Sequence, residues 1–131
     1  MIGIDTNVLV RYLTQDDPIQ SPKATRLIES LTPGLQGYIT LVSVIELVWV
    51  LSGCYGCGRV EIAEILKRLL RAEEFVIAEI DVLQETIPYY ETSHGDFADC
   101  LIERLTHKAG CRQTFTFDRG VAKHCGMTLI Q

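Results

Sequence analysis

MIGIDTNVLVRYL, residues 1–13, begins with strand-forming apolar residues, meets the acidic Asp5, and then resumes with the apolar spacing of a helix. We interpret residues 2–5 as a short buried strand and residues 7–13 as a helix that starts directly from its end. Asp is favoured at helix N-termini, so Asp5 taken alone has a structural explanation. The end of a strand is also the edge at which open α/β sheets bind ligands.

The rest of the chain repeats this alternation of short strands and helices. Further strands are expected at 37–40, 75–77, 114–117 and 127–130. Apolar residues at helical spacing predict helices that include 22–31, 44–51 and 60–70, a helix capped by Asp81 that runs to about Tyr90, a helix within 94–110, and a short one after Asp118. In the second helix Pro22 is expected at the first position, and Ala24, Leu27, Ile28 and Leu31 on one buried stripe. Alternating elements predict an α/β fold with a mostly parallel sheet. With no repeat or linker, we expect one domain, residues 1–131.

Composition and charge narrow the classes of function. Apolar residues make up 47% and charged residues 22%, which is typical of a chain that folds. The net charge of −5 argues against a broad basic face that grips nucleic acid, but divalent cations held by acids would reverse the sign locally. The longest apolar stretch, 39–51, is short for a bilayer and contains Glu46, and no basic leader precedes the first apolar residues. We therefore expect a cytoplasmic protein without a membrane segment.

The five cysteines favour reduced thiols over a disulfide framework, because their number is odd and they are scattered. CYGC, residues 54–57, is either half of a zinc site, a redox pair or part of a glycine-rich turn between two helices. No second metal-binding pair follows at a suitable distance, which favours the turn.

Four acids, Asp5, Glu46, Asp99 and Asp118, stand in apolar surroundings and call for a common explanation. Glu46 lies in LVSVIELVWVL, residues 41–51, which is apolar almost all round, so we expect its carboxylate to be buried on most sides and to need a partner. Asp96 and Asp99 are three residues apart and project from one side of a first helical turn. Asp118, like Asp5, is expected where a strand ends and a helix begins.

Convergence of these acids would require a cation. Two carboxylates about 4 Å apart repel by roughly 4 kcal/mol at an effective dielectric constant near 20. Mg²⁺ or Mn²⁺ would remove this repulsion, because hard cations prefer carboxylate oxygens and water. The pattern therefore predicts a divalent-metal site.

The same residues resemble those of a known family. IDTNVLV near the N-terminus, Glu46 within SVIELVWVL, DFADCLI and TFTFD occur in the order and at about the intervals typical of a PIN domain. The likeness covers nearly the whole chain and is closest to the VapC-type ribonuclease toxins of prokaryotic toxin–antitoxin pairs. It implies a three-layer α/β/α sandwich with a mostly parallel central sheet, and RNA phosphodiester cleavage by water that Mg²⁺, or Mn²⁺ as its substitute, activates.

The resemblance also assigns roles to residues. It implies an acidic quartet of Asp5, Glu46, Asp99 and Asp118, with Asp96 as an additional acid of the metal site. It implies supporting polar positions at Asn7 and Thr116. Arg119 and Lys123, beside Asp118, and Arg11 are candidate phosphate contacts, although surface solvation explains each of them equally well. The implied partners are an RNA substrate, a cognate antitoxin and a second copy of the chain; which RNA is cut stays open.

Two other interpretations of the protein's function remain. A PIN-like module without activity, kept for protein binding, would carry the same acids but would gain no stability from Mg²⁺ or Mn²⁺. A phosphatase with an aspartyl nucleophile would also have an acid at the end of the first strand. Such enzymes usually carry a second Asp two residues later, where this chain has Asn7.

Overall fold

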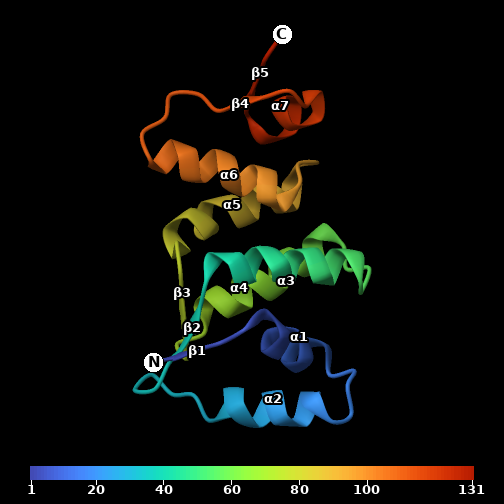
Figure 1. Ribbon diagram of the computed structural model, residues 1–131, viewed down its shortest axis with the longest axis vertical. Coiled ribbons are helices and arrows are strands. Elements are labelled where there is room, and N and C mark those ends of the chain that lie inside the picture. The colour runs from blue at the N-terminus through green and yellow to red at the C-terminus, as the bar shows by residue number, and fades with distance from the viewer. The chain divides into compact units, whose positions relative to one another are not determined.

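A computed structural model describes residues 1–131, which form seven helices and five short strands (Figure 1). The strands are β1 (Ile2–Gly3), β2 (Gly37–Ile39), β3 (Phe75–Ile77), β4 (Phe115–Thr116) and β5 (Thr128–Leu129). The helices are α1 (Thr6–Thr14), α2 (Gln20–Glu29), α3 (Leu41–Gly53), α4 (Arg59–Arg71), α5 (Ile80–Thr92), α6 (Phe97–Lys108) and α7 (Arg119–Cys125). Every strand pairing is parallel, so the predicted α/β class with a parallel sheet is confirmed.

The contacts between residues divide the chain into two compact units. The N-terminal unit consists of Met1–Gly58 and Arg68–Ala78, and the C-terminal unit of Arg59–Lys67 and Glu79–Gln131. Each unit buries its own set of apolar side chains, among them Leu9, Ile39 and Leu47 in the first and Ile62, Leu83 and Leu101 in the second. The single domain over 1–131 stays a prediction, and each unit is described by itself.

The N-terminal unit contains a three-stranded sheet in the order β1-β2-β3. Ile2 pairs with Gly37 in the first ladder, and Gly37 pairs with Phe75 in the second. A Cβ atom at Gly37 would lie 2.9 Å from Ile4 Cγ1 and 3.0 Å from Leu31 Cδ1. A residue without a side chain at the central strand therefore lets the apolar side chains of its neighbours close over the sheet.

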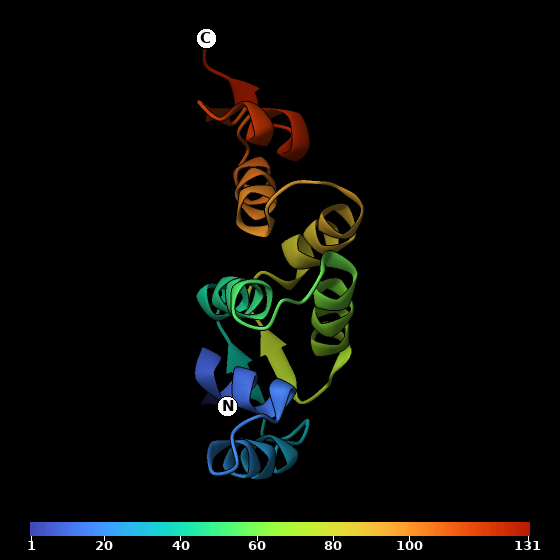
Figure 2. The ribbon, with the colours of Figure 1, turned by 90° about the vertical axis from the view of Figure 1, so that its right-hand side faces the viewer.

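Helix α1 lies between α2 and α3, as Figures 1 and 2 show, and contacts both. Leu9 and Val10 of α1, Ala24 and Ile28 of α2, and Val44, Leu47 and Val48 of α3 are buried. Burial of side chains at this spacing stabilises the packing through the apolar surface removed from water. Leu27 departs from the expected stripe, because 39% of its surface is exposed.

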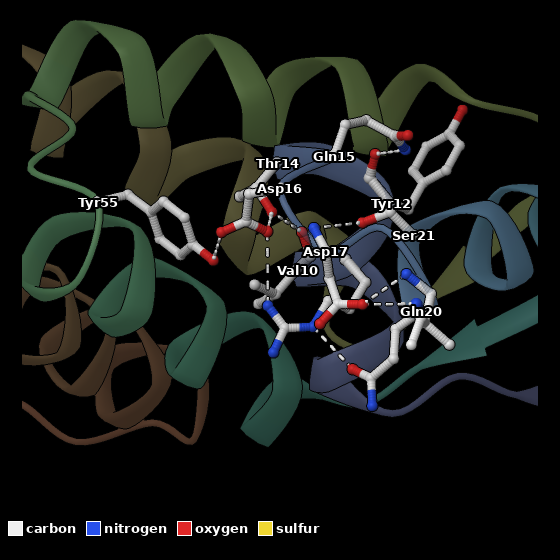
Figure 3. Close-up of polar contacts among 11 residues, drawn as sticks. Val10, Tyr12, Thr14, Gln15, Asp16, Asp17, Gln20, Ser21 and Tyr55 are labelled. Carbon is white, nitrogen blue, oxygen red and sulfur yellow. Dashed lines mark hydrogen bonds and ion pairs between the residues drawn. The ribbon is translucent and has the colours of Figure 1, made fainter.

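The turn between α1 and α2 is held by two consecutive acids (Figure 3). Tyr55 Oη donates to Asp16 Oδ2 at 2.7 Å, and Thr14 Oγ1 donates to Asp16 Oδ1 at 2.8 Å. These hydrogen bonds lower the pKa of Asp16, with the Tyr55 bond contributing most. Asp17 Oδ1 accepts from the backbone N–H groups of Ile19 and Gln20, at 2.9 and 2.7 Å.

This arrangement corrects the predicted start of α2. The helix begins at Gln20 and not at Pro22, because Asp17 supplies acceptors for the N–H groups that precede the proline. Pro22 becomes the third helical residue. The helix loses no hydrogen bond there, since N–H groups of the first turn have no partner within a helix.

The C-terminal unit stacks helices on a two-stranded sheet. Helix α6 contacts α5 and α7, and α7 contacts both β4 and β5, which pair in parallel. Glu79, with φ 55°, precedes α5, so the predicted cap at Asp81 is wrong. Asp81 lies in the first turn of α5 and pairs with Lys108 Nζ at 3.2 Å. Gly110, at φ 96°, follows the end of α6.

The CYGC segment lies in the turn between α3 and α4, as the glycine-rich pattern predicted. Gly56 has φ 64°, a conformation in which other residues are strained. No disulfide joins the five cysteines. No helix combines the length and the apolar character that crossing a membrane requires.

Candidate functional site

Two of the predicted acids meet through Thr6 in the N-terminal unit. Asp5 is the N-cap of α1, and its Oδ1 accepts from the Thr6 backbone N–H at 2.9 Å. The Thr6 hydroxyl donates to Glu46 Oε1 at 2.8 Å. Thr6 is buried, with 8% of its surface exposed, so its hydroxyl has a fixed direction. One residue therefore links carboxylates that come from different helices and lie 41 positions apart in the sequence.

The expected burial of Glu46 is wrong. Its side chain is exposed, and so are Val42 (66%) and Trp49 (78%) on the same side of α3. The opposite side of α3 is buried in the core through Val44, Leu47, Val48 and Leu51. Glu46 thus faces solvent on one side and the Thr6 hydroxyl on the other.

The other acids gather in the C-terminal unit at the starts of two helices. Asp96 is the N-cap of α6, and its Oδ2 accepts from the Asp99 N–H at 3.4 Å. Asp118 is the N-cap of α7, and its Oδ1 accepts from the Val121 N–H at 3.0 Å. Thr116 Oγ1 accepts from the Asp118 N–H at 3.0 Å, which fixes the bend between β4 and α7.

Asp99 lies where partial burial and two neighbouring acids act on one carboxylate. Partial burial raises its pKa, and the charges of Asp96 and Asp118 raise it further. All three effects disfavour the ionised carboxylate. A cation near Asp99 would oppose all three, because it stabilises the charged form and cancels the repulsion.

Close packing holds the loop that precedes Asp96. A Cβ atom at Gly95 would lie 2.6 Å from Cys125 Sγ and 2.7 Å from Cys100 Sγ, so only glycine fits without displacement. The two sulfur atoms are 3.5 Å apart and connect α6 to the end of α7. Burial is the largest cause that raises the pKa of Cys125, to about 12.

Arg59 ties the same loop to the start of α4. Its Nη1 donates to the carbonyl oxygens of Tyr90 and Gly95, at 3.2 and 2.5 Å. Its guanidinium carbon lies 4.7 Å from the centre of the Tyr90 ring. Arg59 thus positions the chain from which Asp96 and Asp99 project.

Sequence reasoning missed Thr6, Gly95 and Arg59 as supporting residues. Thr6 stands between two residues of the recognised motif, and a hydroxyl next to a capping acid was the only available signal. Nothing in the spacing of Gly95 or Arg59 indicates what each contacts. Asn7, which was predicted to support the acids, is exposed and makes no hydrogen bond through its side chain, so its role stays a prediction.

The basic residues that are candidate phosphate contacts differ in their surroundings. Arg119 and Lys123 are exposed on α7, one turn apart. Arg11 Nε donates to Gln20 Oε1 at 2.8 Å, and its Nη1 lies 3.5 Å from Asp16 Oδ1. Arg11 therefore has a structural role, although it also faces a cavity of about 320 Å³ between α1 and α2, together with Asp5 and Asn7.

The donor atoms suit a hard divalent cation. The quartet and Asp96 offer only carboxylate oxygens, which Mg²⁺ and Mn²⁺ prefer. Within neither unit do three or more His, Cys, Asp or Glu side chains come close enough together to hold an ion. Mg²⁺ is commonly bound by one or two carboxylates, with water and substrate phosphates as its other ligands. The chemistry of these residues therefore fits Mg²⁺ without an all-protein cage.

We compared the sequence with models of known protein families. The model of the PIN domain family matches residues 2–126. The chain belongs to the PIN domain family. PIN domains are usually nucleases and generally use divalent metal ions, so membership indicates a nuclease-type function with a nucleic-acid substrate. Neither the curated proteins nor the solved structures contain a match.

Proposed function

We propose that this protein is a Mg²⁺- or Mn²⁺-dependent endoribonuclease of the VapC type, the toxin of a toxin–antitoxin pair. The observation that carries the proposal is the grouping of acids that are distant in the sequence. Asp5 and Glu46 share Thr6 as a hydrogen-bond donor, and the charges of Asp96 and Asp118 act on Asp99. These are the positions at which the sequence resembles the family's acidic quartet.

In this proposal Asp5 and Asp99 are the principal metal ligands, and Asp96, Glu46 and Asp118 bind the ion or accept hydrogen bonds from water around it. A bound Mg²⁺ or Mn²⁺ lowers the pKa of water and stabilises the charge that develops on phosphate. The chain needs no side-chain nucleophile, because water attacks the phosphorus atom.

Neighbouring residues position these acids and the substrate. The Thr6 hydroxyl holds one oxygen of Glu46 and leaves the other available. Thr116 holds the backbone at Asp118. Arg119 and Lys123 contact the phosphates of the RNA, and the Asn7 amide supports water or a carboxylate. Hydrogen bonds of this supporting kind orient ligands and tune the metal.

The test is RNA cleavage by the purified protein, free of antitoxin, with total RNA in Mg²⁺, in Mn²⁺ and in EDTA. Wild-type protein is expected to give discrete fragments only when metal is present, and Asp99→Asn is expected to give none. Cleavage that persists in EDTA, or that is undiminished in the variant, contradicts the proposal. A module that only binds protein would give no fragments and no stabilisation by Mg²⁺.

The toxin role has its own test in growing cells. We expect expression in the cytoplasm to arrest growth, Asp99→Asn to abolish the arrest, and co-expression of the cognate antitoxin to relieve it. Light scattering of the purified protein is expected to give the mass of a homodimer. If cells grow normally although the purified protein cleaves RNA, the proposed nuclease activity stands and the proposed toxin role is contradicted.

A further inference from the structure

The cavity between α1 and α2 contains residues that the proposed reaction does not use. Lys23 and Gln20 line it together with Arg11, Asn7 and Asp5. Residues 20, 23, 24 and 27 face it from α2, and residues 7, 8 and 11 face it from α1. The four positions of α2 have the i, i+3, i+4, i+7 spacing of one helix face, and residues 7 and 8 of α1 each lie about one turn from residue 11, so one side of each helix forms a wall.

The charges in this cavity differ from those of the chain as a whole. Two cations, Arg11 and Lys23, and one acid, Asp5, line it, whereas the chain carries a net charge of −5. Lys23 is exposed and forms no hydrogen bond or ion pair. Arg11 uses two of its five N–H donors on Gln20 and Asp16, so three remain. The cavity can therefore accept a phosphate without breaking an internal contact.

The remaining wall is apolar. Val8, Ala24 and Leu27 line it, and Leu27 is 39% exposed although its spacing predicts a core residue. The exposure of Leu27 is explained by its place in the wall of this cavity, one helical turn from Lys23. An apolar surface next to amide groups suits the flat face and polar edge of a base, since apolar side chains can contact the face of a base while hydrogen bonds read its edge.

We propose that this cavity binds one nucleotide of the RNA strand that the enzyme cuts. Lys23 and the free N–H groups of Arg11 hold its phosphate, Val8, Ala24 and Leu27 contact its base or ribose, and Gln20 and Asn7 provide hydrogen bonds. A volume of about 320 Å³ is at the lower end for small-molecule pockets, which suits one nucleotide. The proposal rests on the proposed function, because Asp5 borders the same cavity and links the bound nucleotide to the strand being cut.

An acidic peptide is the competing occupant, since its carboxylates would also meet Lys23. A peptide carries its carboxylates and its apolar side chains on separate residues, whereas one nucleotide combines a phosphate, a flat ring and a polar edge that match the cations, the apolar wall and the amides of the cavity. The nucleotide therefore accounts for more of the cavity.

Binding is measured in the Asp99→Asn background with Mg²⁺ present, so that the RNA is not consumed. The probe is a short single-stranded oligoribonucleotide of mixed sequence. Two-dimensional NMR is expected to show shifts at the amides of Asn7, Ala24 and Leu27. Inorganic phosphate and an acidic peptide are titrated separately as competing ligands.

Lys23→Gln is compared with Arg26→Gln, which removes an equal charge from α2 at a residue outside the cavity. Losing one charged hydrogen bond is expected to weaken oligonucleotide binding about tenfold. The slope of log K against log salt is expected to fall by about 0.7, the value for one phosphate contact on a single strand. Arg26→Gln is expected to change neither quantity.

Equal effects of the two variants, an absence of shifts at the three amides, or shifts that phosphate or peptide reproduces equally well would overturn the nucleotide site. These outcomes are separate from the fate of the nuclease. If the protein cleaves RNA and Lys23→Gln binds the oligonucleotide as well as the parent does, the nucleotide site is contradicted and the nuclease proposal stands. If Lys23→Gln alone loses binding but the protein never cleaves RNA, the nucleotide site stands and the nuclease proposal is contradicted.

Discussion

The hydroxyl of Thr6 donates a 2.8 Å hydrogen bond to Glu46 Oε1, while the backbone N–H of the same residue donates to Asp5. One buried residue thereby links the N-terminus of α1, its capping acid and a carboxylate from another helix, through its backbone N–H and its hydroxyl. The carboxylate pair is positioned before any ion binds, and this has a direct consequence for mutagenesis.

Thr6→Val keeps the shape of the side chain and removes the donor. We expect RNA cleavage to fall about 10- to 100-fold, the effect typical of lost supporting hydrogen bonds at metal sites. Thr6→Ser keeps the hydroxyl and should restore most of the activity. The measurement is the initial cleavage rate at several Mg²⁺ concentrations; equal rates for Val and Ser would show that the hydroxyl has no role.

Asp99→Asn should stabilise the metal-free protein while it abolishes cleavage. Burial and the charges of Asp96 and Asp118 raise the pKa of Asp99 above its ordinary value of 3.8, so the folded state binds the proton more tightly than the unfolded state does. Ionisation therefore opposes folding at neutral pH. This unfavourable effect disappears as the pH falls through the titration of Asp99, and the advantage of the variant should shrink with it.

Thermal unfolding in EDTA at neutral and acidic pH checks this expectation. Asp81→Asn is the matched control, because the hydrogen bond from Lys108 lowers the pKa of Asp81 and its ionisation favours folding. We expect this variant to melt at a slightly lower temperature than wild type at neutral pH. A lower melting temperature for Asp99→Asn in EDTA would mean that its carboxylate stabilises the fold.

Gly95→Ala should destabilise the C-terminal unit. The added methyl group would approach the Cys100 and Cys125 sulfur atoms to less than 3.0 Å, and overpacking of this kind typically raises the free energy of the folded state by about 1–3 kcal/mol. Gly53→Ala in α3 is the control, because a Cβ atom there meets nothing within 4 Å. Urea unfolding should show a lower midpoint for the first variant only.

Thiol alkylation should separate the cysteines by their surroundings. Cys54 and Cys111 are exposed, whereas Cys100 and Cys125 are buried and the pKa of Cys125 is raised to about 12. Since the thiolate is the nucleophile, iodoacetamide at pH 8 should modify the exposed pair and leave Cys125 unmodified until the protein unfolds. Mass spectrometry of peptides measures the order, and early modification of Cys125 would contradict the described packing.

Local rules explain what could be predicted from the sequence. Asp5 and Asp118 were placed correctly where strands end and helices begin, because capping by Asp and helical spacing are properties of neighbouring residues. The start of α2 was missed, since Asp17 competes with Pro22 as the initiating signal and the outcome depends on which N–H groups find acceptors.

Contacts between distant segments explain what could not be predicted. The helix around Glu46 is apolar almost all round, so periodicity could not identify which side faces water, and the exposed one carries Val42 and Trp49. The same limitation applies to Thr6 and Gly95, whose partners lie 40 positions away and up to 36 positions away, respectively.

The central claim is that acids from both ends of the sequence serve one reaction, and a double-mutant cycle tests it most directly. Cleavage rates in Mg²⁺ are measured for Asp5→Asn, Asp99→Asn and the variant that carries both. Residues that act as a unit give non-additive losses, so we predict that the double variant is no slower than the slower single one. Losses that multiply, or a single variant with the wild-type rate, would contradict the claim.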